Sequence, residues 1–148
     1  MSIPALNEDG FLPDGIFECT IDEISERFGS FQRTDKRPNL FKGLLSYYNE
    51  LKSANIGKHL IVNGSFVTTK DEPNDIDVLL ILKDDVELSG DLPPFKKNTM
   101  SRKYINKYYQ LDFHFGFEGD PSATNILEIF LEVKYQPEKT KGILKIAL

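Results

Sequence analysis

The amino-acid sequence predicts an α/β (α+β) protein in which helices flank a small β-sheet. Short apolar runs of strand length alternate along the chain with segments whose apolar residues recur at helical spacing. Alternation of this kind is typical of a sheet covered by helices. The chain has 148 residues, 40% of them hydrophobic and 28% charged, which is usual for one globular domain. We therefore expect residues 1–148 to form a single domain.

The first third of the chain is predicted to be an arm followed by two helices. Residues 1–19 combine prolines and glycines with apolar side chains, so we expect an extended N-terminal arm that packs against the body. Thr20 and Glu23 have the spacing of a capping box, which predicts a short helix that ends at Gly29. A longer amphipathic helix is predicted over residues 37–54.

The remainder of the chain is predicted to be mainly strands joined by helices. The strand at 110–117 alternates apolar and polar residues, whereas the other predicted strands are short apolar runs. Strands are expected at 58–63, 75–82, 110–117 and 142–148. Helical segments are expected at 66–69, at 96–108 and from Ser122 to about Tyr135, and loops at 70–74, 83–95 and 137–141.

Charge and cysteine content exclude several classes of protein. The net charge is −5 and the pI is about 5.1, so general DNA binding is not expected, because it usually needs a basic surplus. With Cys19 as the only cysteine, neither an internal disulfide nor a multi-cysteine zinc site can form. No apolar stretch approaches a membrane span or a signal peptide. We therefore expect a soluble, cytoplasmic protein with no membrane partner.

One group of residues has the chemistry of a phosphate and metal site. Gly64 follows a predicted buried strand, and Ser65 begins a short helical turn whose N–H groups can receive a phosphate. Asp75 and Asp77 are two positions apart on a predicted strand, so both side chains emerge on one face. If the strand that carries Asp112 pairs beside them, three carboxylates converge, and Mg²⁺ relieves their repulsion. Such a set can hold two metal ions.

These residues resemble the signature of the polymerase-beta-like nucleotidyltransferase superfamily. That signature is a hydrophobic strand, Gly-Ser, about ten further residues, and two Asp separated by one apolar residue. It corresponds here to Ile61 to Ser65 and Asp75 to Val78, with Asp112 on a third-carboxylate strand. More narrowly, the chain resembles a bacterial family of uncharacterised nucleotidyltransferase-like proteins. The segments that carry this likeness are 6–13, 63–68, 73–77 and 141–143.

The resemblance implies a nucleotidyltransferase fold, with a small mixed sheet flanked by helices. It implies that Asp75, Asp77 and Asp112 are catalytic and bind Mg²⁺, and that Gly64 and Ser65 bind the phosphates of a nucleoside triphosphate. The superfamily often has an Arg soon after Gly-Ser, and in this chain Lys70 is the candidate for that contact. The acceptor hydroxyl would belong to a protein or an RNA. Relatives of this kind occur in toxin–antitoxin pairs, so a cognate helical toxin is one candidate partner.

Each feature also has a plainer interpretation. Asp75 and Asp77 can simply cap a loop and face solvent, and Asp112 can be a surface strand residue. His114, on the same face as Asp112, can be an ordinary solvent-facing or core histidine. The basic residues of 96–107 can form a solvated helix face or a patch that steers phosphates. For the whole chain, the alternative function is a non-catalytic protein of the same fold that acts as an antitoxin-like binding partner. A phosphohydrolase that uses the same metals is a third class.

Overall fold

The computed structural model is a mixed sheet flanked by helices, as expected, and it describes residues 3–88, 90 and 92–148. Met1 and Ser2 of the predicted arm, and Ser89 and Asp91 of the predicted loop, lie outside the described residues. The sheet has the strand order β1-β7-β2-β3-β4. Its strands are β1 (Ile16–Cys19), β7 (Ile143–Ala147), β2 (Gly57–Asn63), β3 (Ile76–Leu82) and β4 (Leu111–Phe117). The outer pairs β1–β7 and β3–β4 are parallel, and the two inner pairs are antiparallel.

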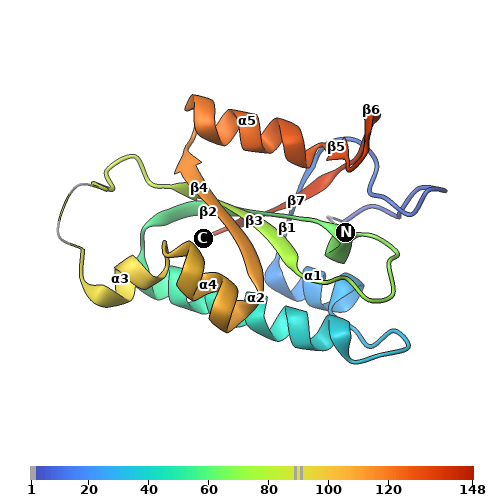
Figure 1. The fold of residues 1–148 in the computed structure, drawn as a ribbon, viewed down its shortest axis with the longest axis horizontal. Helices are drawn as coiled ribbons and strands as arrows, with labels where there is room; N and C mark the ends of the chain where they lie inside the picture. Colours follow the sequence, from blue (N-terminus) through green and yellow to red (C-terminus); the bar gives the residue numbers. More distant parts are fainter. Residues whose placement is uncertain (1–2, 89, 91) are drawn as a thin grey trace.

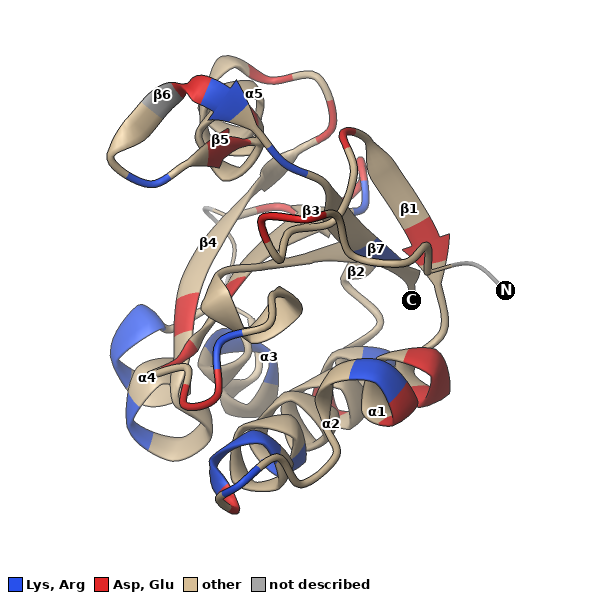
Figure 2. Cartoon of the chain, turned by 90° about the vertical axis from the view of Figure 1, so that its right-hand side faces the viewer, with Lys and Arg blue, Asp and Glu red and all other residues tan. Residues whose placement is uncertain are grey.

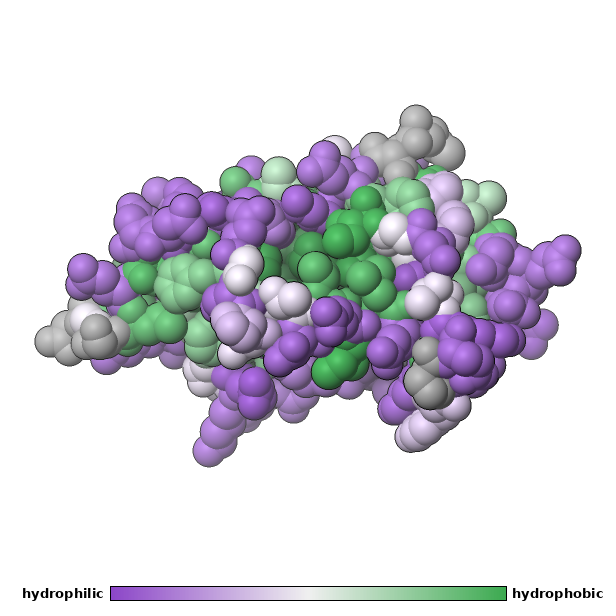
Figure 3. Space-filling view, turned by 90° about the horizontal axis from the view of Figure 1, so that it is seen from above, coloured by the Kyte–Doolittle hydropathy of each residue, from purple (hydrophilic) through white to green (hydrophobic). Residues whose placement is uncertain are grey.

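Helices cover the two faces of the sheet unequally (Figure 1). On one face lie α1 (Ile21–Phe28), α2 (Lys36–Ala54), α3 (Pro94–Asn98) and α4 (Arg102–Tyr109), which enclose the larger apolar core. On the other face α5 (Pro121–Phe130) packs over a smaller cluster that includes Ile61 and Leu79. Seen from the α5 side, apolar residues gather along the middle of the molecule (Figure 3). Of the helices described, none has the length and apolar character needed to cross a bilayer.

Local signals place several elements where the sequence predicted them. The Thr20 hydroxyl accepts from Glu23 N, and the Glu23 carboxylate accepts from Thr20 N, so the capping box that begins α1 is confirmed. Asn55 ends α2 in the left-handed conformation at φ 54°. Gln110 does the same after α4, at φ 57°, and the chain enters β4 at the next residue.

Four element predictions are wrong in part. The end of the arm is strand β1, which pairs with β7 at the edge of the sheet. The helix expected at 96–108 is two helices, because Ser101 caps α4 by accepting from Tyr104 N. The helix expected to continue to Tyr135 ends at Phe130 and is capped by Asp120 rather than Ser122. Strands β5 (Glu132–Val133) and β6 (Gln136–Thr140) then form a hairpin in place of the expected loop at 137–141.

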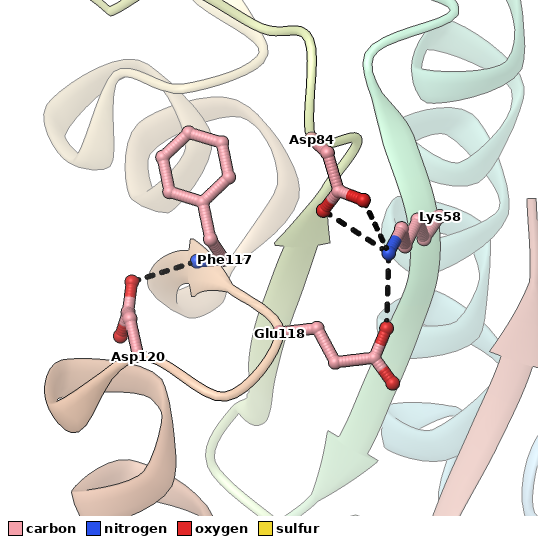
Figure 4. Close-up of polar contacts among 5 residues, drawn as sticks. All are labelled: Lys58, Asp84, Phe117, Glu118 and Asp120. Atoms are coloured by element: carbon pink, nitrogen blue, oxygen red, sulfur yellow. Dashed lines mark hydrogen bonds and ion pairs between the residues drawn. The ribbon is translucent and has the colours of Figure 1, made fainter.

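The end of the sheet where β2 begins and β3 and β4 finish is held by ion pairs (Figure 4). Lys58 Nζ lies 3.1 Å from Asp84 Oδ1 and 3.0 Å from Glu118 Oε2, so one ammonium links all three strands. Beside it, Asp120 accepts hydrogen bonds from Phe117 N at 2.9 Å and Ala123 N at 2.7 Å. These bonds fix the start of α5 to the end of β4.

A buried arginine anchors the turn at the opposite end of β2. Arg37, on α2, is 0% exposed. Its guanidinium donates to Phe28 O at 3.1 Å, Phe66 O at 2.6 Å and Thr68 O at 2.7 Å. It also donates twice to Lys70 O. Because no side chain but arginine offers five donors in a rigid fork, this one residue can bond to three carbonyl groups of the 66–70 turn at once.

We predict that Arg37→Met lowers the free energy of unfolding by about 3 kcal/mol or more, because it removes the donors to two buried carbonyl groups and two partly buried ones. Urea unfolding followed by circular dichroism measures the change. The control is Arg33→Met, because the Arg33 side chain is 83% exposed and pairs with Asp71 at 3.4 Å. That variant should change stability by less than about 0.5 kcal/mol. Equal effects of the two substitutions would contradict an anchoring role for Arg37.

Candidate functional site

Acidic residues meet at the edge of the sheet where β2 ends and β3 and β4 begin. The antiparallel register of β2 and β3 places Asn63 opposite Asp77. The parallel register of β3 and β4 places Asp77 beside Asp112. Asp75 comes two residues before Asp77, just ahead of β3. The pairing on which the three-carboxylate prediction depended is therefore present, although Asp75 precedes the strand instead of starting it.

A cleft of about 880 Å³ opens at this edge. Figure 2 faces this end of the molecule, with the β5–β6 hairpin above the sheet and α1, α2 and α4 below it. All six residues predicted for the site line the cleft: Gly64, Ser65, Lys70, Asp75, Asp77 and Asp112. The other walls come from three segments that are distant in sequence, namely residues 9–11 of the arm, the end of α5 and the β5–β6 hairpin.

The backbone at Gly64 makes room for Asp77. Gly64 has φ 95°, a conformation that side chains other than glycine rarely adopt. A Cβ atom at this position would lie 2.8 Å from Asp77 Oδ2. Ser65 then begins the 3₁₀ turn η1 (Ser65–Val67), whose backbone Arg37 anchors through Phe66 O. The glycine therefore makes room for the Asp77 carboxylate, and its role in the approach of a ligand stays a prediction.

The carboxylates are close enough to change each other's ionisation. Burial, and then the negative charges of Asp75 and Asp112, raise the pKa of Asp77 to about 6, and a hydrogen bond with Asp112 adds to the effect. Burial and the charge of Asp112 also raise the pKa of Asp75. Lys141 acts in the opposite direction on Asp77. Burial and mutual repulsion therefore disfavour the ionised form of Asp75 and Asp77, and a bound cation would favour that form.

The donor chemistry fits Mg²⁺ with an incomplete protein shell. Carboxylate oxygens are the ligands that Mg²⁺ prefers, and it commonly takes one or two of them together with water and substrate phosphates. In the described ranges, no group of three or more His, Cys, Asp or Glu side chains is already arranged to hold a metal ion. The site thus offers an open edge of carboxylates beside a wide cleft, where oxygen atoms of a ligand could complete the coordination.

Other residues singled out in the sequence divide into two groups. His114 lines the cleft, with Nε2 3.8 Å from Asp112 Oδ1 and its ring 6.0 Å from that of Phe130. Lys70 also lines it, with an exposed side chain, while Arg37 holds its carbonyl group. By contrast, the cleft is lined by none of the basic side chains of residues 96–107.

Lys141 is a site residue that the sequence analysis did not assign. It is 7% exposed and lines the cleft. Its Nζ donates to Asn63 Oδ1 and, at 2.9 Å, to Phe130 O. Burial lowers its pKa to about 8, and the charge of Asp77 opposes that shift. The sequence placed Lys141 at the end of a polar loop, so a buried cation there could be found only once β6 and β7 were positioned.

We predict that Asp77→Asn stabilises the protein at pH 7.5 by about 1–2 kcal/mol, because each unit of pKa shift corresponds to about 1.4 kcal/mol and part of it is lost to solvent screening. The pKa of Asp77 is higher in the folded chain than its ordinary value of 3.8, so folding favours the protonated acid. Its contribution to stability is greatest below about pH 4 and is lost as the pH rises through 6. The gain should therefore shrink at pH 4.5.

Urea unfolding of wild type and variant at both pH values measures this difference. Asp84→Asn is the control, because Asp84 is an exposed carboxylate with a cationic partner, Lys58, and its removal should give no gain. A variant at position 77 no more stable than wild type at pH 7.5 would show that the carboxylates do not destabilise the fold.

Comparison with known proteins gives one match. The model of a family of unknown function, DUF6932, matches residues 4–147, a range that contains every residue of the cleft. Among curated proteins and among solved structures, nothing matches the chain.

Proposed function

We propose that this chain, which belongs to the DUF6932 family, is a Mg²⁺-dependent nucleotidyltransferase of the polymerase-beta-like superfamily. It would move a nucleoside monophosphate from a nucleoside triphosphate to an acceptor hydroxyl on a protein or an RNA. The observation that carries the proposal is the pairing of Asp77 with Asp112 on adjacent parallel strands, beside the Gly64–Ser65 turn. The chain's resemblance in sequence to that superfamily supports the same assignment.

The size and lining of the cleft support a phosphorylated ligand. A volume of about 880 Å³ lies in the range of small-molecule and cofactor pockets. Its acidic edge would repel a polyphosphate by itself, so the ligand would have to arrive with divalent cations. The walls away from the carboxylates include apolar groups such as Ile129, which is 65% exposed. One cleft thus combines a surface for metal and phosphate with a surface for the less polar part of a nucleotide.

In the proposed reaction, the acceptor oxygen forms a bond to the α-phosphorus, the bond from that phosphorus to the bridging oxygen breaks, and pyrophosphate leaves. Asp75 and Asp77, with Asp112, would hold Mg²⁺, which supplies Lewis-acid neutralisation of the phosphate charge. Asp112 lines the cleft and its side chain is half-exposed, so it would accept the proton of the acceptor hydroxyl. Backbone N–H groups from Gly64 and Ser65 would orient the β- and γ-phosphates.

We predict that wild-type protein transfers label from an α-labelled nucleotide to a component of a cell extract in the presence of Mg²⁺. Asp77→Asn should lower this transfer by at least about a hundredfold, because even indirect partners of a metal site are worth 10- to 100-fold. The nucleotide is chosen beforehand by a thermal-shift series with Mg²⁺ and ATP, GTP, CTP or UTP, as the one that shifts the melting temperature of the protein most.

The matched control is Asp71→Asn, in the 70–74 loop that leads to β3, because Asp71 pairs with exposed Arg33 and does not line the cleft. It should retain full transfer. Undiminished transfer by the Asp77 variant would refute the site. If no nucleotide at millimolar concentration shifts the melting temperature of the wild type, the alternative of a non-catalytic binding partner is favoured. If the protein hydrolyses the nucleotide and transfers no label to an acceptor, a phosphohydrolase is favoured.

A further inference from the structure

Three lysines line the cleft, and they differ sharply in their surroundings. Lys70 and Lys134 have exposed side chains, and the Lys134 ammonium lies over the ring of Tyr135 at 5.2 Å. Lys141 is 7% exposed and is held from two sides. A charged side chain is seldom buried to this extent unless it is paired or has a specific task. Of the cationic side chains described in the cleft, Lys141 therefore has the most clearly built environment.

The ammonium of Lys141 has one donor that the structure leaves unassigned. An ammonium group has three N–H donors. One bonds to Asn63 Oδ1 at the end of β2, and one bonds to Phe130 O at the end of α5. Within the described residues, Lys141 Nζ has no third hydrogen-bond acceptor. Because Lys141 lines the cleft, a ligand there could supply one.

Lys141 also lies on the acidic side of the cleft. Its acceptor Asn63 is opposite Asp77 in the β2–β3 register, and Asp77 and Lys141 interact electrostatically. Four side chains therefore follow one another across this end of the sheet: the Lys141 ammonium, the Asn63 amide, and the carboxylates of Asp77 and Asp112. An anionic group bound beside Asp77 would have a fixed ammonium on the side of Asp77 away from Asp112.

We propose that Lys141, rather than Lys70, is the cationic side chain that binds the nucleotide, and that it donates its third N–H to a non-bridging phosphate oxygen. This inference rests on the proposed function. The two fixed acceptors hold the side chain in one conformation before the ligand binds, which lowers the entropic cost of the contact. The long, exposed side chain of Lys70 would lose more conformational freedom in the same task.

The first test uses isothermal titration calorimetry to measure the dissociation constant of the protein for a Mg²⁺–nucleoside triphosphate. The triphosphate used is the one that shifts the melting temperature of the wild type most. Loss of a hydrogen bond to a charged group weakens binding roughly 10- to 100-fold, so we expect that change for Lys141→Met. Lys70→Met should change the dissociation constant less than threefold, because an exposed ion pair contributes little free energy. Lys145→Met is the matched control on β7, because Lys145 pairs with Glu18 at 3.7 Å, and it should bind like wild type.

A second measurement uses the wild-type protein and does not depend on the folding of a variant. The probe is a nucleotide whose terminal phosphate carries a pyridoxal aldehyde, which forms a Schiff base with an adjacent amine and is fixed by borohydride reduction. Peptide mass spectrometry should locate the adduct at Lys141, and excess Mg²⁺–triphosphate should prevent it.

The outcomes separate this inference from the function on which it rests. Wild-type binding that persists unchanged in Lys141→Met, or an adduct at Lys70 or Lys134 or at no lysine, would overturn the role of Lys141 and leave the proposed function standing. A wild type that binds no Mg²⁺–triphosphate would overturn both. If Lys141→Met does not fold, the position of the adduct decides.

Discussion

The parallel pairing of β3 with β4 places two carboxylates side by side, and the rest of the site is arranged around that repulsion. Asp77 and Asp112 occupy paired positions, and Asp75 adds a third negative charge. A shift of register by one residue would turn one of the paired side chains to the other face of the sheet, so the arrangement depends on the strands keeping their alignment. Burial of these carboxylates is tolerated because Asp77, whose pKa is raised to about 6, can hold a proton.

The neighbouring residues make this arrangement possible in different ways. Gly64 leaves the space that the Asp77 carboxylate occupies, and Lys141 supplies the buried positive charge. Arg37 fixes the turn after Gly64 by bonding to its carbonyl groups from the helical layer. At the far end of the same strands, Lys58 ties β2 to the ends of β3 and β4. The electrostatically unfavourable end of the sheet is thus fixed to the helical layer by the buried hydrogen bonds of Arg37, and the exposed ion pairs of Lys58 join the opposite ends of the same strands.

The sequence predicted the parts that depend on local chemistry. The capping box at Thr20, the strands at 58–63, 75–82 and 110–117, and the Gly-Ser turn all follow from short-range rules, and the structure has them close to the expected bounds. The convergence of the carboxylates was predicted only on the condition that two strands pair. That condition is met through long-range hydrogen bonding, which no local pattern specifies.

The features that the sequence did not predict depend on distant partners. Strand β1 is short and has no alternating pattern, and it is recognisable only by its pairing with β7. The hairpin β5–β6 follows directly on an apolar helix, so the periodicity of α5 gave no sign of its end. Arg37 and Lys141 were read as a helix start and a loop end, since a sequence pattern does not show which charged side chain will be buried.

Binding of a divalent cation at the three carboxylates is the claim on which the account depends most directly. Electron paramagnetic resonance of Mn²⁺, a substitute for Mg²⁺ with the same preference for oxygen ligands, measures it by the loss of the free-ion signal. The account predicts saturable Mn²⁺ binding by the wild type at pH 7.5 that disappears when Asp77 and Asp112 are both changed to Asn. Mn²⁺ binding that is the same in that double variant as in the wild type, or absent from both, would contradict it.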